Sequence, residues 1–192
     1  MMLTLLAALS LQTAHAPPVP AGPEGPCQID RQAMLALGMN AFDQDHQGGW
    51  RVVSERPNCE GAAAELIRDY RAFMLDRIPI LYWHEGQLRA NLGQNAEAIS
   101  LMDRTRRASG DARASWWNPY VDGTIAFLRG DRTALTEARA RLAAVPRPAD
   151  HPADLAWPPN LAVVDGLIRC FGRPYREAYF ADACQRPATT SR

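Results

Sequence analysis

The sequence contains no lysine, so all 21 of its Lys and Arg residues are arginine. This absence excludes several catalytic classes, because P-loop nucleoside triphosphatases, pyridoxal-phosphate enzymes and Ser-Lys hydrolases each depend on a lysine side chain. The exclusive use of arginine, in a chain rich in alanine, is typical of proteins from GC-rich bacteria.

Other local signatures of catalysis are missing as well. There is no Gly-x-Ser-x-Gly motif to place a nucleophilic serine, and no two cysteines are close enough for a Cys-x-x-Cys pair. His84-Glu85 begins like a zinc-protease motif, but Leu88 stands where the second histidine is required. The sequence therefore predicts no catalytic residue, no bound metal of this kind and no cofactor.

Charge gives no sign of a nucleic-acid partner. The 21 basic residues are balanced by 21 acidic ones, so no global field attracts an anionic polymer or an anionic membrane. One basic cluster consists of Arg104, Arg106, Arg107 and Arg113. It lies around the end of an expected helix, where cations complement the helix dipole. We expect no nucleic-acid partner.

The N-terminus resembles an export signal, although it has no Lys or Arg before its apolar core. Leu3 to Leu11 form that core, and Ala14-His15-Ala16 provides the small-x-small pattern that signal peptidase accepts. The core is shorter than the ~20 residues that span a bilayer. We expect a signal peptide over residues 1–16, cleavage after Ala16, a Pro/Gly linker over 17–26 and a periplasmic or secreted product without a transmembrane segment.

The four cysteines are Cys27, Cys59, Cys170 and Cys184, an even number that favours two disulfides in an exported chain. Three connectivities are possible. The chain between Cys27 and Cys59 goes out and returns, which allows these two to meet. Pairing of Cys170 with Cys184 then follows by elimination, and it requires the last helix to break near Phe180.

Apolar residues recur at helical spacing nearly throughout, and no stretch alternates with period two, so the fold class is predicted to be all-α. Glycines at 93, 130 and 172 mark helix ends. We expect one domain over residues 27–184, with an N-terminal helical cap at 27–78, helical hairpins at 79–184 and a flexible tail at 185–192. Helices are expected over 28–42, 50–55, 59–76, 79–92, 95–107, 115–129, 131–145, 160–171 and 174–181.

A short motif recurs three times in the second part of the chain. Glu85-Gly86-Gln87-Leu88 is followed by Asp122-Gly123-Thr124-Ile125 and by Asp165-Gly166-Leu167-Ile168, at spacings of 37 and 43 residues. Periods of this size indicate stacked supersecondary units.

Over residues 79–181 these copies, with the segment GQNAEAI at 93–99, resemble the tetratricopeptide family, whose 34-residue unit is a pair of antiparallel helices. Tyr82, Arg89 and Leu135 depart from the family pattern. The resemblance implies a right-handed α-solenoid of antiparallel helical hairpins. It also implies a concave partner-binding surface, with inward-facing positions at Trp83, Gln87, Ala90, Trp117, Tyr120, Thr124 and Phe127. The alternative for the large aromatics is a place in the core.

Residues 42–50 come close to a calcium loop. Asp43, Asp45 and Gln47 occupy its first, third and fifth positions, and Gly48 its sixth. Position twelve is Ser54, and the nearest acid, Glu55, comes one residue late. The loop therefore lacks the bidentate carboxylate that such sites need, and an acidic hydrated turn is the other interpretation.

The leading hypothesis is a non-enzymatic module of the cell envelope that binds a protein or peptide on a concave helical surface. One alternative is a small-ligand-binding protein or an enzyme whose site has no local signature. Another is a calcium-binding structural protein that uses residues 43–55.

The disulfide assignment can be tested by peptide mapping without reduction. We expect one fragment that joins Cys27 to Cys59 and one that joins Cys170 to Cys184. A fragment that joins Cys27 to Cys170 would contradict the assignment.

Overall fold

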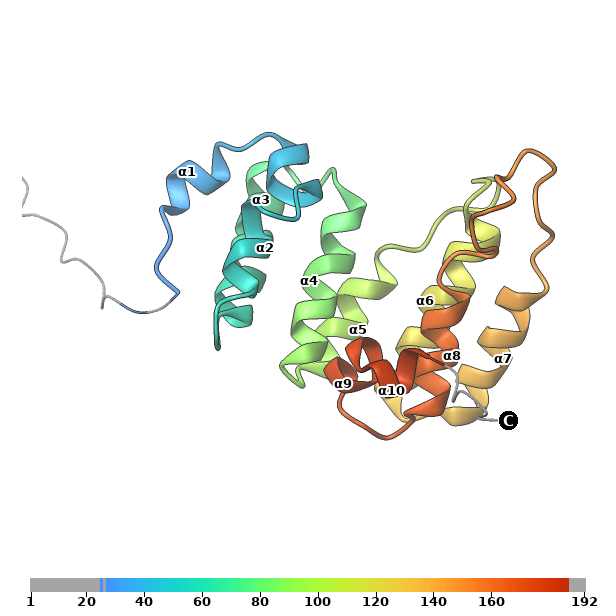
Figure 1. Cartoon of the computed structure of the whole chain (residues 1–192). Helices are drawn as coiled ribbons and strands as arrows, with labels where there is room; N and C mark the ends of the chain where they lie inside the picture. The colour runs from blue at the N-terminus through green and yellow to red at the C-terminus, as the bar shows by residue number, and fades with distance from the viewer. Residues whose placement is uncertain (1–24, 26, 187–192) are drawn as a thin grey trace, which may run out of the picture.

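The computed structural model describes residues 25 and 27–186, and this part of the chain is helical without any strand (Figure 1). The all-α class is therefore confirmed. The expected signal peptide at 1–16, the linker at 17–26 except Gly25, and residues 187–192 of the expected tail lie outside the described residues.

The N-terminal cap contains α1 (Arg31–Leu35), the π-helical turn η1 (Asn40–Gln44), α2 (Gly49–Ser54) and α3 (Glu60–Phe73). The continuous helix expected over 28–42 is wrong, because the chain breaks between α1 and η1. Long-range packing explains the break. The ring of Phe42 stacks on Tyr70 with 3.6 Å between centroids, and the Tyr70 hydroxyl donates to the carbonyl of Leu37 at 2.8 Å.

The second part of the chain is a succession of helices in which each packs against the next (Figure 1). The helix expected over 95–107 ends four residues early. The elements are α4 (Pro79–Asn91), α5 (Asn95–Asp103), α6 (Ala114–Arg129), α7 (Arg132–Ala143), α8 (Leu161–Arg169), α9 (Tyr175–Phe180) and α10 (Asp182–Gln185). The last expected helix, 174–181, is present as α9 and ends at Phe180 as expected, and a further short helix, α10, follows it.

Three turns between helices contain the glycines that the sequence marks as helix ends. Gly93, Gly130 and Gly172 have φ angles of 74°, 71° and 86°. A side chain strains the backbone in this left-handed region, which is why glycine commonly ends a helix there. The expected helix ends are confirmed at these positions.

Helix α4 lies between two apolar cores. Its residues Leu81 and Leu88 belong to the core of the cap, with Phe42 and Tyr70 among their neighbours. Other residues of the same helix, Trp83 among them, belong to the core that α5 to α10 share. Most residues of α4 are buried, including two that are charged, and its apolar residues are shared between the two cores, so α4 is their common wall.

A buried ion network joins α3 to α4. Glu85 is 1% exposed and accepts from Arg71 of α3 at 2.9 Å, while Arg71 also donates to Asp76 at 2.8 Å. Arg89, one turn further along α4, reaches Glu65 of α3 at 2.5 Å. Burial raises the pKa of the Glu85 carboxyl despite the neighbouring guanidinium of Arg71. Because an unpaired charge in this place is costly, the network fixes how α3 and α4 are aligned.

Both expected disulfides are present. The Cα atoms of Cys27 and Cys59 are 5.2 Å apart, and those of Cys170 and Cys184 are 5.6 Å apart. The second bridge forms because α9 ends at Phe180 and the chain turns into α10, as the sequence requires. Two disulfides are compatible with export to an oxidising compartment.

None of the described helices combines the length and the apolarity that a membrane crossing demands.

Gly86 and Gly123 hold equivalent places in the recurring motif but have different surroundings, and this difference can be measured. A Cβ at Gly86 would lie 2.9 Å from Cγ of Met102 and 3.3 Å from the carbonyl oxygen of Ala98, whereas a Cβ at Gly123 would meet nothing closer than 3.4 Å. We expect Gly86→Ala to destabilise the protein by about 1–3 kcal/mol. Gly123→Ala should be neutral or stabilise it by up to about 1 kcal/mol, because alanine favours the helix.

Urea unfolding of both variants against the wild type measures the difference. Equal changes in the free energy of unfolding would show that α4 and α5 do not meet as closely as described.

Candidate binding groove

The aromatic surface expected from the repeat resemblance does not face solvent. Trp83, Trp117, Tyr120, Thr124 and Phe127 are all buried, and none of them is more than 8% exposed. The ring of Trp83 packs against Trp117 and Tyr120, with centroids 5.0 and 4.8 Å apart. These aromatics are core residues, and the expectation that they form an exposed groove is wrong. Ala90 is likewise buried.

Residues of α9 lie against two of these positions, Phe127 and Tyr120. Helix α9 lies beside α4, and its Tyr175 ring lies 6.1 Å from that of Phe127 (Figure 1). The hydroxyl of Tyr179 is 3.4 Å from that of Tyr120. Gln87 differs from the other expected groove residues, because it is only half-buried and lines a cavity to which α9 also contributes.

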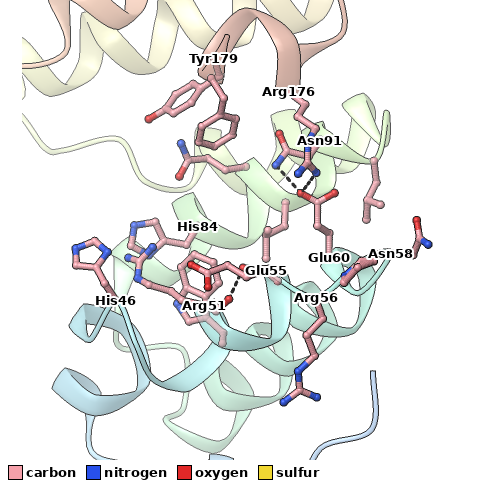
Figure 2. A pocket seen from close by; sticks show the side chains of 17 residues that line it. His46, Arg51, Glu55, Arg56, Asn58, Glu60, His84, Asn91, Arg176 and Tyr179 are labelled. Atoms are coloured by element: carbon pink, nitrogen blue, oxygen red, sulfur yellow. Dashed lines mark hydrogen bonds and ion pairs between the residues drawn. The ribbon is translucent and has the colours of Figure 1, made fainter. Parts of the chain in front are cut away.

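This cavity is a groove of about 940 Å³ that the cap, α4 and α9 form together (Figure 2). The cap provides one side, α4 and the turn after it provide the middle, and α9 provides the opposite side. The groove has charged, amide, aromatic and aliphatic side chains. They are His46, Trp50, Arg51, Ser54, Glu55, Arg56, Pro57, Asn58 and Glu60 from the cap, His84, Gln87, Leu88, Asn91 and Leu92 from the middle, and Arg176, Tyr179 and Phe180 from α9.

Two polar contacts meet on Glu60 and connect the sides of the groove. Arg176 of α9 forms an ion pair with Glu60 at the start of α3, and Asn91 of α4 donates from Nδ2 to the same carboxylate at 3.1 Å (Figure 2). The side chain of Glu60 is only 15% exposed, whereas that of Arg176 is 60% exposed. The pair therefore holds α9 near the cap at a modest energetic gain.

At another part of the groove, Asp43 positions His84. Oδ1 of Asp43 lies 2.6 Å from Nδ1 of His84 and accepts from the Trp50 indole at 2.8 Å, while Oδ2 accepts from Gln44 at 2.5 Å. Asp43 is fully buried, and the His84 side chain is 15% exposed. Within the described chain, Nε2 of His84 has no hydrogen-bond partner and is not buried, so it remains open to the groove.

Two opposing effects act on the pKa of Asp43. Burial raises it, and the contacts with His84, Trp50 and Gln44 lower it by more, so the pKa of this carboxyl is below its ordinary value of 3.8. Asp43 is therefore ionised at neutral pH and serves as the anchor for both an imidazole and an indole.

The residues considered for calcium do not form a site. Asp43 points into the protein and is used by Trp50 and His84, whereas Asp45, Gln47 and Glu55 are exposed. Asp45 accepts from the backbone N–H of Gln47 at 2.9 Å, as in an ordinary turn. In residues 25 and 27–186, no three His, Cys, Asp or Glu side chains are grouped as metal ligands. This finding contradicts the calcium hypothesis for residues 43–55.

Sequence reasoning identified Gln87 but missed the groove as a whole. Its residues come from α2, the start of α3, α4 and α9, and no spacing along the chain connects them. A local signal of the groove is the segment 43–50, which contains Asp43, His46 and Trp50 and whose spacing also resembles a calcium loop.

No protein-family model, curated protein or solved structure matches this chain.

The role of Asp43 predicts a pH-dependent stability difference. Asp43→Asn should destabilise the protein by about 1–3 kcal/mol at pH 7, because a charged acceptor for His84 and Trp50 is lost. Since the folded-state pKa of Asp43 is lowered, its charge stabilises the fold above about pH 4. This contribution disappears as pH falls through the folded-state pKa, so the difference from the wild type should shrink in acid.

Urea unfolding at several pH values between 7 and 3 measures this dependence. Asp45→Asn is the matched control, since Asp45 is exposed and asparagine can keep its turn contact; it should change stability by less than about 0.5 kcal/mol. A loss for Asp43→Asn that stays constant with pH would contradict the assignment.

Proposed function

We propose that this protein is a non-enzymatic module of the cell envelope, periplasmic or secreted, that binds an extended peptide or a protein segment in the groove. The observation that carries the proposal is the composition of the groove. It combines amide side chains on α4 with exposed apolar side chains at Leu92 and Phe180. Peptide recognition requires both, because amides bind the peptide backbone and apolar surfaces take the side chains.

The proposed architecture is a right-handed stack of helical hairpins with an N-terminal cap. The three acid-Gly-x-aliphatic copies at 85–88, 122–125 and 165–168 support it, since their glycines lie at α4, α6 and α8. Gly86 faces α5, and Gly123 lies against both α7 and α8, so two copies meet the helix that follows them. In such a stack, a cap is needed to cover the first unit, and the cap here also forms one side of the groove.

Asn91 adds a polar feature that suits a peptide. Its Nδ2 donates to Glu60, while its Oδ1 is buried and has no hydrogen-bond donor within the described residues. A buried acceptor without a partner is costly, but a peptide N–H can reach this atom only if the Asn91 side chain first turns toward the groove. Asn91 lies where α4 meets both sides of the groove.

A small-ligand-binding protein or an enzyme is the second candidate, and the Asp43–His84 pair favours it. A buried carboxylate that orients an imidazole, with the other nitrogen free, is the arrangement of a general base. The volume of the groove, about 940 Å³, is at the upper end for small ligands. Hydrolysis of chromogenic esters that depends on His84 would favour this candidate over peptide binding alone.

The proposal predicts that peptides selected on the protein use the groove. From a displayed library of 12-residue random peptides, we expect binders whose affinity falls at least about tenfold with Phe180→Asp, because this apolar side chain is replaced by a charge. Fluorescence anisotropy of the synthesised peptides measures the affinity.

Phe73→Asp is a closely matched control. Phe73 is 63% exposed and Phe180 is 62% exposed, but Phe73 is on α3 and outside the groove. Its substitution should leave the affinity unchanged. Thermal unfolding establishes that both variants fold. A selection without binders, or binders that tolerate Phe180→Asp, would contradict the proposed function.

A further inference from the structure

Arg51 of α2 has an unusual setting at the end of the groove where the cap meets α4. Its Nε donates to the backbone carbonyl of Asp43 at 2.9 Å, and its guanidinium lies over the Trp50 ring at 4.3 Å from the centroid. These two contacts restrain the side chain from two directions. Arginine held in this way loses little further conformational freedom when its terminal nitrogens bind a ligand.

The charge of Arg51 has no carboxylate partner within the described residues. Glu55, one turn further along the chain, also lines the groove but makes no ion pair with Arg51. At the other part of the groove, Arg176 is paired with Glu60. The terminal nitrogens of Arg51 are not buried and make no hydrogen bond in the described structure, so they are available to a ligand.

The carboxylate of Asp43 does not neutralise the charge of Arg51 by a direct contact. Asp43 meets Arg51 through its backbone carbonyl, while its carboxylate is used by Trp50, His84 and Gln44. His46 and His84 line the same groove as Arg51 (Figure 2). Both His84 and Arg51 contact Asp43 and Trp50. Each imidazole, when protonated, adds a second donor to an anion held by the guanidinium.

We propose that this end of the groove is a carboxylate site, in which the terminal nitrogens of Arg51 bind a carboxylate of the peptide, with His46 and His84 beside it. The inference rests on the proposed function and specifies its ligand as an acidic peptide. A planar guanidinium matches a carboxylate with two parallel hydrogen bonds, which gives direction as well as affinity. The site belongs mainly to the cap, which has no copy of the recurring motif.

The arrangement of the groove also implies the order in which chemical groups follow one another along a bound peptide. Arg51 and Phe180 come from opposite sides of the groove, and Gln87 and Asn91 of α4 lie in the middle. A ligand that uses all of these has an acidic group at one end, backbone amides over α4 and an apolar side chain near α9. A peptide with the charges reversed would bring a cation to Arg51 and lose affinity.

The peptides selected from the random library test this inference. We expect Asp, Glu or a free C-terminal carboxylate at a fixed distance from an apolar residue. Arg51→Gln should weaken binding of these peptides at least about tenfold, and Arg51→Lys should weaken it less, because charge remains while the planar fork is lost. Arg77→Gln is the control, since Arg77 is exposed and outside the groove.

Peptides synthesised with a C-terminal amide, or with Asp and Glu replaced by Asn and Gln, identify which carboxylate is bound. Removing the carboxylate that Arg51 binds should lower the affinity of the peptide for the wild-type protein. The same removal should not lower the affinity for Arg51→Gln, because that variant has already lost the contact. If Arg51→Gln unfolds, the salt dependence of binding to the wild type and to Arg51→Lys provides the second measurement, because a charge pair weakens as ionic strength rises.

The two proposals fail in different ways. Binders that need Phe180 but carry no acidic group and tolerate Arg51→Gln would overturn the carboxylate site and leave peptide binding intact. A library that yields no Phe180-dependent binder would overturn both.

Discussion

The buried ion network between α3 and α4 is the constraint on which the rest of the structure depends. Arg71 of α3 reaches Glu85 of α4, and Arg89 of α4 reaches Glu65 of α3, so the two helices are tied in both directions. A shift of either helix by one turn would separate Glu85 from Arg71 and leave it only the longer contact with Arg89 of its own helix, which is costly for a buried carboxylate. Because α4 is the wall shared by both cores, this alignment also places His84, Gln87 and Asn91 in the groove.

Features with a local cause could be predicted from the sequence. Helix ends at Gly93, Gly130 and Gly172 follow from the conformational freedom of glycine, and the break near Phe180 follows from the reach that a Cys170–Cys184 bridge requires. The interruption between α1 and η1 could not be predicted in this way. It depends on Phe42 and Tyr70, which are 28 residues apart and meet only in the folded chain.

The candidate site likewise depends on contacts between residues that are distant in sequence, which a sequence pattern does not reveal. Positions such as Trp83 and Tyr120 have the spacing of inward-facing repeat residues, but spacing does not reveal that they pack on each other or that α9 returns to place Tyr179 against Tyr120. The residues that remain open come from elements that are distant in sequence, and Arg51 and Glu55 carry no pattern that distinguishes them from surface charges. Gln87 is the one expected binding position that lines the groove, and it was expected there from the family resemblance; its role in binding stays a prediction. Arg51 is distinguished from other surface arginines only by its contacts with the Trp50 ring and the backbone carbonyl of Asp43, which form in the folded chain.

The two disulfides bear on when the proposed binding groove is complete. Cys59 lies next to Glu60 on the cap side of the groove, and the Cys170–Cys184 bridge encloses the whole of α9 on the opposite side. Each side of the groove is therefore constrained by a disulfide bond, and a reducing cytosol does not maintain disulfide bonds. In the exported protein that we propose, a newly made chain would lack a finished groove until it is oxidised. The recognition of its ligand would then be confined to its destination, without any inhibitor to keep it inactive on the way.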